Sequence, residues 1–308
     1  MAAAITYQPA YNGEWGTPRV VAGGTYGTDT LLLPDGTPIF YRFWQHPNPA
    51  APILVLVHGL GAHSAWFLDF GSVLHAGGQT VYALDHRGFG RSGGVRGHIR
   101  RGDQLLDDME AFVDMIGQRH PGIPRVLLGH SMGGLFSVHL AARDATSGRG
   151  RIAGMILVNP WIRDTAKVSP RALVTVLVGG PRGSLAIPAG TDAADTSVMT
   201  LNPAAATMLL ADERWVRRRT ASFYYQIALR MRGKALRQAK LVRAPALVIQ
   251  VERDRSVVAS ASEQCFKALG SADKQWLSIP EMAHDFEFEP ARAPLDDAIV
   301  QWMGRFRR

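Results

Sequence analysis

The chain has 308 residues, of which 46% are hydrophobic and 19% are charged. This composition excludes an intrinsically disordered chain, and no apolar stretch approaches the roughly 18 residues that a membrane-spanning helix needs. The one cysteine, Cys265, excludes an internal disulfide and suits a reducing compartment. The N-terminal residues lack the basic start and apolar core of a signal peptide, so we expect a cytoplasmic protein.

The net charge of +8 is concentrated in one segment. Residues 160–243 contain 14 Lys and Arg against 5 Asp and Glu, a net charge of +9 that leaves the remainder close to neutral. Such a segment is either a solvated helical face or a surface that contacts an anionic partner, for which a membrane is a candidate. Nucleic-acid binding is disfavoured because no recognised motif accompanies the arginines.

The pattern of elements along the chain predicts an α/β protein. Residues 1–28 have no sustained period and form a leader. Residues 30–44 predict two strands around a Pro-Asp-Gly turn. Short apolar runs, which are typical of strands buried on both faces, then alternate with helical patterns. The expected strands are 53–57, 80–84, 125–129 and 154–159, and the expected helices are 66–78, 102–120 and 134–145.

The alternation stops after residue 159 and resumes at 246–251, with a helix at 260–270, a strand at 275–279 and a terminal helix. Residues 160–243 between them contain no clear strand and carry helical, basic and apolar patches. The sequence therefore predicts a parallel α/β core at 29–159 and 244–308, interrupted by a mostly helical cap at 160–243.

A glycine motif, Gly88, Gly90 and Gly93, has the spacing of a dinucleotide-binding fingerprint. That fingerprint requires a helix directly after the glycines and an acid about 20 residues on, at the end of the next strand. Here the helix begins only near Gly102, and Glu110 lies inside it. We therefore expect a structural loop, in which Asp85, Arg87 and Ser92 bond neighbouring turns, and no bound cofactor.

The strongest chemical signal is the G-x-S-x-G of residues 129–133, which follows a predicted strand and opens a predicted helix. This context is that of a nucleophile elbow, in which Ser131 has a strained backbone and an exposed hydroxyl. The glycines on either side let neighbouring backbone approach closely. Ser131 is therefore the predicted nucleophile.

A serine nucleophile needs a base, and the base needs an orienting acid. His284 is the only histidine after His139 and follows a predicted strand, so it is the predicted base. Asp254 follows the preceding strand and is the favoured acid. Glu252, Asp273 and Asp285 remain alternatives, of which Asp273 precedes its strand and Asp285 adjoins the histidine.

The oxyanion hole needs two backbone amides. The residue after the nucleophile, Met132, supplies one, and Leu60 in the "HGLG" loop after the first buried strand is the candidate for the other. His63, in the same loop, could face the substrate. No group of His, Cys, Asp or Glu has the spacing of a zinc site, so we predict no metal.

These pieces together resemble the α/β-hydrolase superfamily, and within it the monoacylglycerol lipase and lysophospholipase group. The matching stretches are "HGLGAHSAW", "DHRGFGRSGG", "RGHIRRGDQLLDDMEAFVD", "GHSMGG", "ERDRSVV" and "MAHDFEFE". The resemblance implies a mostly parallel eight-stranded sheet with helices on both faces and a helical cap after the sixth strand. It also implies hydrolysis of carboxylic esters without a cofactor. Ala62, where this group commonly has a glutamate, puts the substrate in doubt.

Apolar and aromatic residues of the predicted cap are candidates for an acyl pocket, although most of them must bury the cap on the core. The candidates are Trp161, Leu173, Val174, Val176, Leu177, Phe223, Tyr224 and Tyr225. The expected substrate is a monoacylglycerol, a lysophospholipid or a similar ester. The alternatives are an esterase for small or xenobiotic esters, a thioesterase, a C–C bond hydrolase, an aminopeptidase, or a non-catalytic receptor on the same fold.

Overall fold

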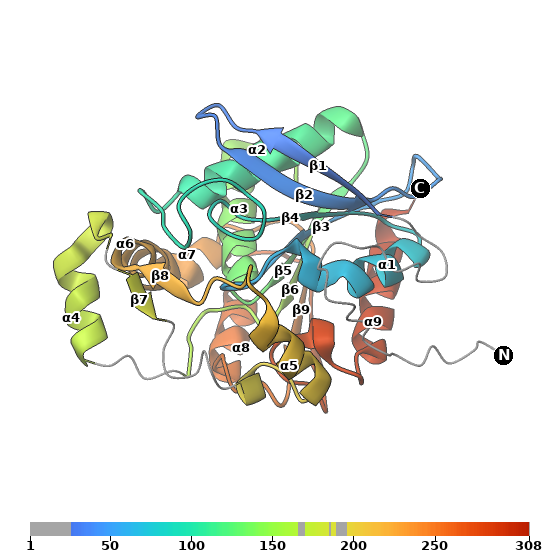
Figure 1. The fold of residues 1–308 in the computed structure, drawn as a ribbon. Coiled ribbons are helices and arrows are strands. Elements are labelled where there is room, and N and C mark those ends of the chain that lie inside the picture. The colour runs from blue at the N-terminus through green and yellow to red at the C-terminus, as the bar shows by residue number, and fades with distance from the viewer. Residues whose placement is uncertain (1–25, 166–169, 185, 189–195, 308) are drawn as a thin grey trace.

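The computed structural model of the protein describes residues 26–165, 170–184, 186–188 and 196–307. Its centre is an eight-stranded sheet in the order β1-β2-β4-β3-β5-β6-β9-β10 (Figure 1). The first two strands are antiparallel to their neighbours, and the remaining pairs are parallel. The strands are β1 (Gly27–Leu32), β2 (Pro38–Trp44), β3 (Ile53–Val57), β4 (Thr80–Leu84), β5 (Arg125–His130), β6 (Gly154–Val158), β9 (Ala246–Val251) and β10 (Lys274–Ile279).

Helices cover both faces of this sheet, so the predicted fold class is confirmed. The α-helices of the core are α1 (Leu68–Ala76), α2 (Gln104–Arg119), α3 (Met132–Ser147), α8 (Ala259–Ala268) and α9 (Ala293–Met303). The single-turn helices of the core are η1 (Ser64–Phe67), η7 (Phe286–Phe288) and η8 (Gly304–Phe306). Helices α2, α3 and α8 share one hydrophobic core, while α1 and α9 share the other.

The central strands are mostly apolar on both faces because both of their faces are buried. In β3, Ile53, Val55 and Val57 pack into the core beneath α2 and α3. The alternate residues, Leu54 and Leu56, pack into the core beneath α1 and α9. This two-residue period aligns the carboxyl ends of the parallel strands along one edge of the sheet, where α/β proteins place their sites.

The segment between β6 and β9 packs against the core, with α4 at its outer end (Figure 1), and part of it shares the hydrophobic core of α2 and α3. The expectation that it contains no clear strand is wrong, because two short strands in it pair antiparallel. Its elements are α4 (Pro170–Gly179), η2 (Gly180–Arg182), β7 (Ala186–Pro188), η4 (Thr196–Val198), α5 (Pro203–Ala211), β8 (Arg218–Thr220), α6 (Ala221–Tyr224), the π-helix η5 (Tyr225–Met231), η6 (Arg232–Lys234) and α7 (Ala235–Ala239).

The glycine motif forms the structural loop that its position among the predicted elements favoured. Asp85, directly after β4, accepts hydrogen bonds from the amides of Ser64 (2.6 Å) and Arg91 (2.7 Å). Arg87 forms two hydrogen bonds of 2.8 Å to Asp108 in α2. The loop is therefore held by buried polar contacts to the sheet edge and to α2.

None of the described helices is both long and apolar enough to span a bilayer.

Candidate active site

The turn between β5 and α3 holds Ser131 in a strained conformation. Its φ of 52° and ψ of −114° lie outside the regions that a residue with a side chain prefers. A Cβ at Gly133 would lie 2.0 Å from the carbonyl oxygen of Val57, and a Cβ at Gly129 would lie 2.3 Å from that of Gly133. Only glycine fits at either position, so the tight strand–turn–helix geometry depends on both of them.

His284 and Asp254 lie on the loops after β10 and β9, and their side chains meet. Nδ1 of His284 lies 2.7 Å from Oδ2 of Asp254, whose side chain is 1% exposed. The other carboxylate oxygen accepts the amides of Ser256 (2.7 Å) and Val257 (2.9 Å). Because Nδ1 donates to a carboxylate, Nε2 of the neutral ring is left as a proton acceptor. Glu252, the first alternative acid, is exposed and accepts from Ser278 instead.

The two predicted oxyanion amides are free of protein acceptors. In the described part of the chain, neither the Leu60 nor the Met132 amide donates a hydrogen bond. The loop that carries Leu60 adjoins the nucleophile, since a Cβ at Gly59 would lie 3.3 Å from Cβ of Ser131. Met132 is the first residue of α3, where the helix dipole favours a negative charge. Both amides can therefore receive a developing oxyanion.

Comparison with known proteins assigns this arrangement to a family. The sequence pattern of the family described as serine aminopeptidase, S33, matches residues 48–291. The chain belongs to this family. It is an α/β-hydrolase, and among the α/β-hydrolases it falls in the monoacylglycerol-lipase-like group of carboxylic ester hydrolases.

Individual relatives agree with this assignment. The chain is 28% identical over 268 residues to a monoacylglycerol lipase of Mycolicibacterium smegmatis, a match that covers 87% of this chain and 93% of that protein. It is 24% identical over 250 residues to a phospholipase of Bacillus subtilis, covering 81% and 93% of the two chains. The crystal structure of a soluble variant of monoglyceride lipase from Saccharomyces cerevisiae, with a substrate analogue, has the same fold. Its TM-score is 0.82 at 21% identity, covering 98% of this chain and 99% of that one.

The backbone carbonyl of His284 is held by two side chains in this hydrolase. Nε2 of His130, the residue before the nucleophile, lies 2.9 Å from that oxygen, and Nδ2 of Asn159 lies 3.0 Å from it. Oδ1 of Asn159 in turn accepts the amide of Val251 at the end of β9 (2.9 Å). This role of Asn159 was not predicted from the sequence. Its signal was a polar residue at the carboxyl end of a buried parallel strand.

Two buried acids, Asp285 and Glu287, also surround His284. Glu287 lies 3.0 Å from Nδ1 of His130, and Asp285 lies 3.8 Å from Nε2 of the same ring. Burial, together with repulsion from Glu287, raises the pKa of Asp285 to about 7. Burial alone would lower the pKa of His284, but Asp254 and these two acids raise it to about 9. The imidazole of His284, the predicted base, therefore lies near acidic groups that favour its imidazolium form.

The same residues form a group that a metal ion could in principle use. Ligand atoms of His130, His284 and Asp285 lie within 4.8 Å of one another, the one such group in the described part of the chain. However, Nε2 of His130 and Nδ1 of His284 already bond protein oxygens. The cluster is thus better matched to orienting His284 than to binding a metal.

The predicted substrate-contacting residues are scattered. Trp161 is buried beside the elbow, and its amide donates to the Ser131 carbonyl (2.9 Å). His63 is buried and bonds Asp212 at 2.8 Å, while the hydroxyl of Tyr224 accepts from Arg219. Two further candidates, Val174 and Leu177, are 58% and 55% exposed on α4, at the outer end of the cap (Figure 1). Their contact with a substrate stays a prediction.

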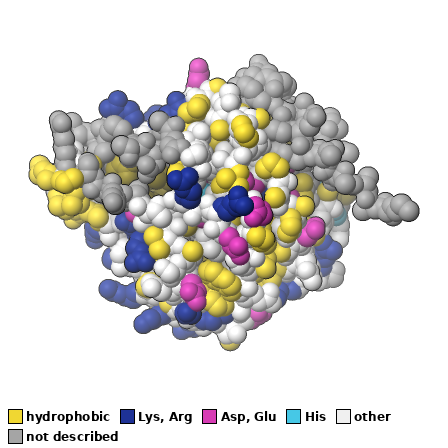
Figure 2. Space-filling view, turned by 90° about the horizontal axis from the view of Figure 1, so that it is seen from below, with side chains coloured by type: hydrophobic (Ala, Val, Ile, Leu, Met, Phe, Trp, Pro, Cys, Tyr) yellow, Lys and Arg dark blue, Asp and Glu magenta, His cyan; other side chains and the backbone are white. Residues whose placement is uncertain are grey.

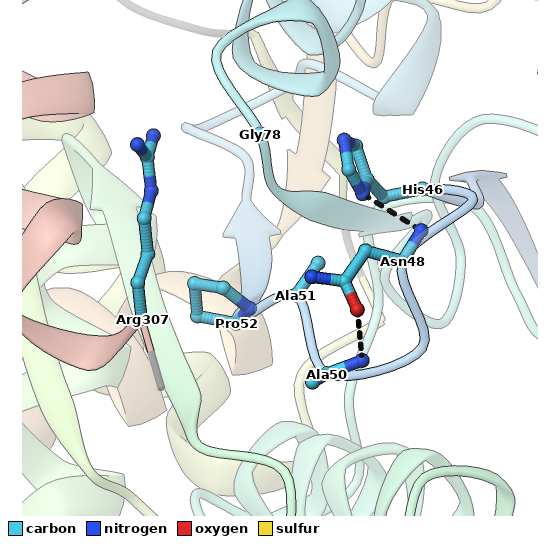
Figure 3. Close-up of a pocket in the computed structure, with 7 residues that line it drawn as sticks. All are labelled: His46, Asn48, Ala50, Ala51, Pro52, Gly78 and Arg307. Carbon is cyan, nitrogen blue, oxygen red and sulfur yellow. Dashed lines mark hydrogen bonds between the residues drawn. The ribbon is translucent and has the colours of Figure 1, made fainter.

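A hollow of about 230 Å³ lies elsewhere on the protein (Figure 3). It is lined by His46, Asn48, Ala50, Ala51, Pro52, Gly78 and Arg307, with the amide of Asn48 bonded to His46 at 3.1 Å. Pro52 directly precedes the amino end of β3, and Gly78 lies two residues before that of β4. Ser131, Asp254 and His284 follow the carboxyl ends of parallel strands, so this hollow lies at the opposite edge of the sheet and is not the substrate site.

Proposed function

We propose that the protein hydrolyses lipid-like carboxylic esters, such as monoacylglycerols, through Ser131, His284 and Asp254. The observation that carries the proposal is the 2.7 Å contact between His284 and Asp254 beside a serine held at a φ of 52°. The names of two relatives, a monoacylglycerol lipase and a phospholipase, support an acyl ester of a lipid as the substrate. The free amides of Leu60 and Met132 supply the oxyanion hole.

In the proposed mechanism the reaction proceeds in two steps, acylation of Ser131 and hydrolysis of the acyl-enzyme. Oγ of Ser131 attacks the ester carbonyl carbon while its proton passes to Nε2 of His284. The oxyanion collapses, the ester C–O bond breaks, and the leaving alcohol takes that proton. Water then attacks the carbonyl carbon of the acyl-enzyme and gives a proton to His284. The bond to Oγ of Ser131 breaks, Oγ takes that proton back, and the fatty acid leaves. Asp254 keeps the imidazole in the required tautomer and stabilises its charged form.

Activity of the wild type and of Ser131→Ala tests the proposal. The substrates are 1-monooleoylglycerol, lysophosphatidylcholine and a chain-length series of p-nitrophenyl esters. We expect hydrolysis of long acyl esters by the wild type, a loss of at least about 10³-fold in Ser131→Ala, and labelling of Ser131 by a fluorophosphonate. Equal hydrolysis by both proteins would overturn the nucleophile assignment, and a rate maximum at short chains would favour a small-ester esterase.

Aminopeptidase activity is a second candidate because the matching family carries that description. A terminal amine substrate needs an anionic group to receive it. Asp285 and Glu287 are such groups, but both are buried behind the base. Amino-acid p-nitroanilides distinguish the two functions, since only an aminopeptidase releases nitroaniline from them at a rate comparable with ester hydrolysis.

We further propose that the cap contacts an anionic membrane surface. Helix α4 exposes four neighbouring apolar side chains, which gather at one end of the molecule (Figure 2): Leu173 (40%), Val174 (58%), Leu177 (55%) and Val178 (83%). The surrounding segment has a net charge of +9. Apolar insertion and attraction to anionic headgroups would act together. Vesicle binding that is independent of both the anionic lipid content and the salt concentration would refute this proposal.

We propose the cytoplasm as the compartment, because the one cysteine of the sequence, Cys265, suits a reducing environment. Cell fractionation tests the location.

A further inference from the structure

The loop that carries Leu60 is gripped by a segment of the cap. The carbonyl of Gly61 accepts the amide of Val216 at 2.9 Å. Gly61 has a φ of +85°, and a Cβ there would lie 2.8 Å from Nε1 of Trp215. The loop backbone one residue beyond Leu60 is therefore in direct contact with the cap backbone and with a cap tryptophan.

Asp212 makes the second connection between the cap and this loop. It is 1% exposed, and its Oδ2 accepts Nε2 of His63 at 2.8 Å and Nε1 of Trp66 at 2.9 Å. Nδ1 of His63 accepts the amide of Ala65, so its proton must reside on the nitrogen that faces Asp212. Burial alone would raise the pKa of Asp212, but the bonds from His63 and Trp66 lower it, so the side chain is a carboxylate.

The far end of the loop is fixed to the core. Both the amide and the hydroxyl of Ser64 donate to Oδ1 of Asp85, at 2.6 and 2.5 Å. The loop thus has one anchor on the sheet, at Ser64, and two on the cap, at Gly61 and His63. Between β3 and Gly61 only residues 58–60 remain, so the orientation of the Leu60 amide depends on where the cap segment lies.

An apolar cluster holds the cap segment against the core beneath these bonds. It joins α5 and the following turn to residues beside the loop and to η7, through Ala62, Trp66, Ala205, Leu209, Trp215 and Phe288. The bond from Trp66 to Asp212 joins two side chains that are 4% and 1% exposed, and breaking it would leave a buried donor unpaired. The contact is therefore persistent.

We propose that Asp212 is a positioning residue for the oxyanion hole, tying the cap to the loop that presents the Leu60 amide. The inference rests on the proposed esterase function. It predicts that residues 212–216 stay with the core whenever other parts of the cap move, because their displacement would dismantle the oxyanion hole.

Oxygen esters and the matching thionoesters test this role. Backbone amides stabilise a developing oxyanion much better than a thiolate-like sulfur, because sulfur is a weak hydrogen-bond acceptor. We expect Asp212→Leu to lower kcat for the oxygen ester about 10- to 100-fold with little change in KM, and to lower the thionoester rate several-fold less. Asp212→Asn, whose amide oxygen can still accept from His63 and Trp66, should recover most of the rate.

Glu213→Leu is the matched control, since Glu213 is exposed on the same turn. It should leave both rates unchanged. If Asp212→Leu is poorly folded by thermal unfolding, Asp212→Ala and His63→Ala carry the same two expectations at a temperature where each is folded.

An unchanged oxygen-ester rate in a folded variant, or equal losses on both substrates, would overturn the positioning role while leaving the ester hydrolase intact. A wild type that hydrolyses neither substrate would overturn the proposed function and this inference together.

Discussion

The pH dependence of hydrolysis depends on the environment of His284. The pKa of this residue rises from 6.5 to about 9 in the folded protein, which corresponds to about 3 kcal/mol in favour of the imidazolium. Only the neutral ring accepts the proton of Ser131. Because the pKa is raised, the neutral, active form of the ring becomes abundant only at higher pH. We therefore expect kcat/KM to increase with pH up to about 9.

Replacing Asp254 with asparagine should move this rise of kcat/KM to lower pH. Burial has the largest effect on the pKa of His284 and lowers it. Among the groups that raise this pKa, Asp254 contributes most. In Asp254→Asn we expect the pH at the midpoint of this rise in kcat/KM to fall to about 6.5 or below. The plateau should fall by about 10³- to 10⁴-fold, because the asparagine no longer fixes the imidazole tautomer.

The assay is kcat/KM for a soluble ester between pH 5 and 10.5, with released acid followed by pH-stat and the uncatalysed rate subtracted. The control is Asp273→Asn, which removes an exposed acid that pairs with Arg305 at 2.7 Å. This control should keep the wild-type profile. A wild-type midpoint at or below 6.5, or an identical midpoint in Asp254→Asn, would refute the electrostatic argument.

Three further changes test the elbow, the carbonyl clamp and the cap. Gly133→Ala should destabilise the fold by at least about 2 kcal/mol in chemical denaturation, because its methyl group meets backbone of a central strand; an unchanged midpoint would contradict the packing argument. Asn159→Ala should lower kcat about tenfold at constant KM by freeing the His284 carbonyl, and a change in KM alone would contradict a positioning role. Leu177→Ser with Val178→Ser should weaken vesicle binding but keep hydrolysis of a soluble ester, whereas Leu32→Ser, at an exposed site on β1, should change neither.

Local patterns were enough to predict the sheet and the position of the elbow. The strands of the core are short apolar runs bounded by glycine or proline, and the G-x-S-x-G stands between one of them and a helix. The cap was harder to predict. β8 is three residues long, and basic and apolar residues around it allow several helical phases, so the sequence could not separate β8 from α6.

The apolar residues of α4 illustrate a second limit. Val174 and Leu177 were pocket candidates because they are apolar, but apolarity alone does not say which face of a helix points inward. Only Val176 of the described α4 side chains is buried, and Val178 is 83% exposed. The direction of the helix relative to the core decided this, and that direction depends on contacts across the whole fold.

The residues that fix the catalytic geometry are joined across long stretches of sequence, which is why no motif revealed them. Asn159 reaches the carbonyl of His284 across 125 residues, and His63 reaches Asp212 across 149. The nucleophile needs no such help, because a strand and a helix on either side hold it. The proposed base and the oxyanion loop lie outside regular structure and depend on a few hydrogen bonds from distant residues. Substitutions at these bonds should therefore reduce turnover more than they reduce the stability of the sheet.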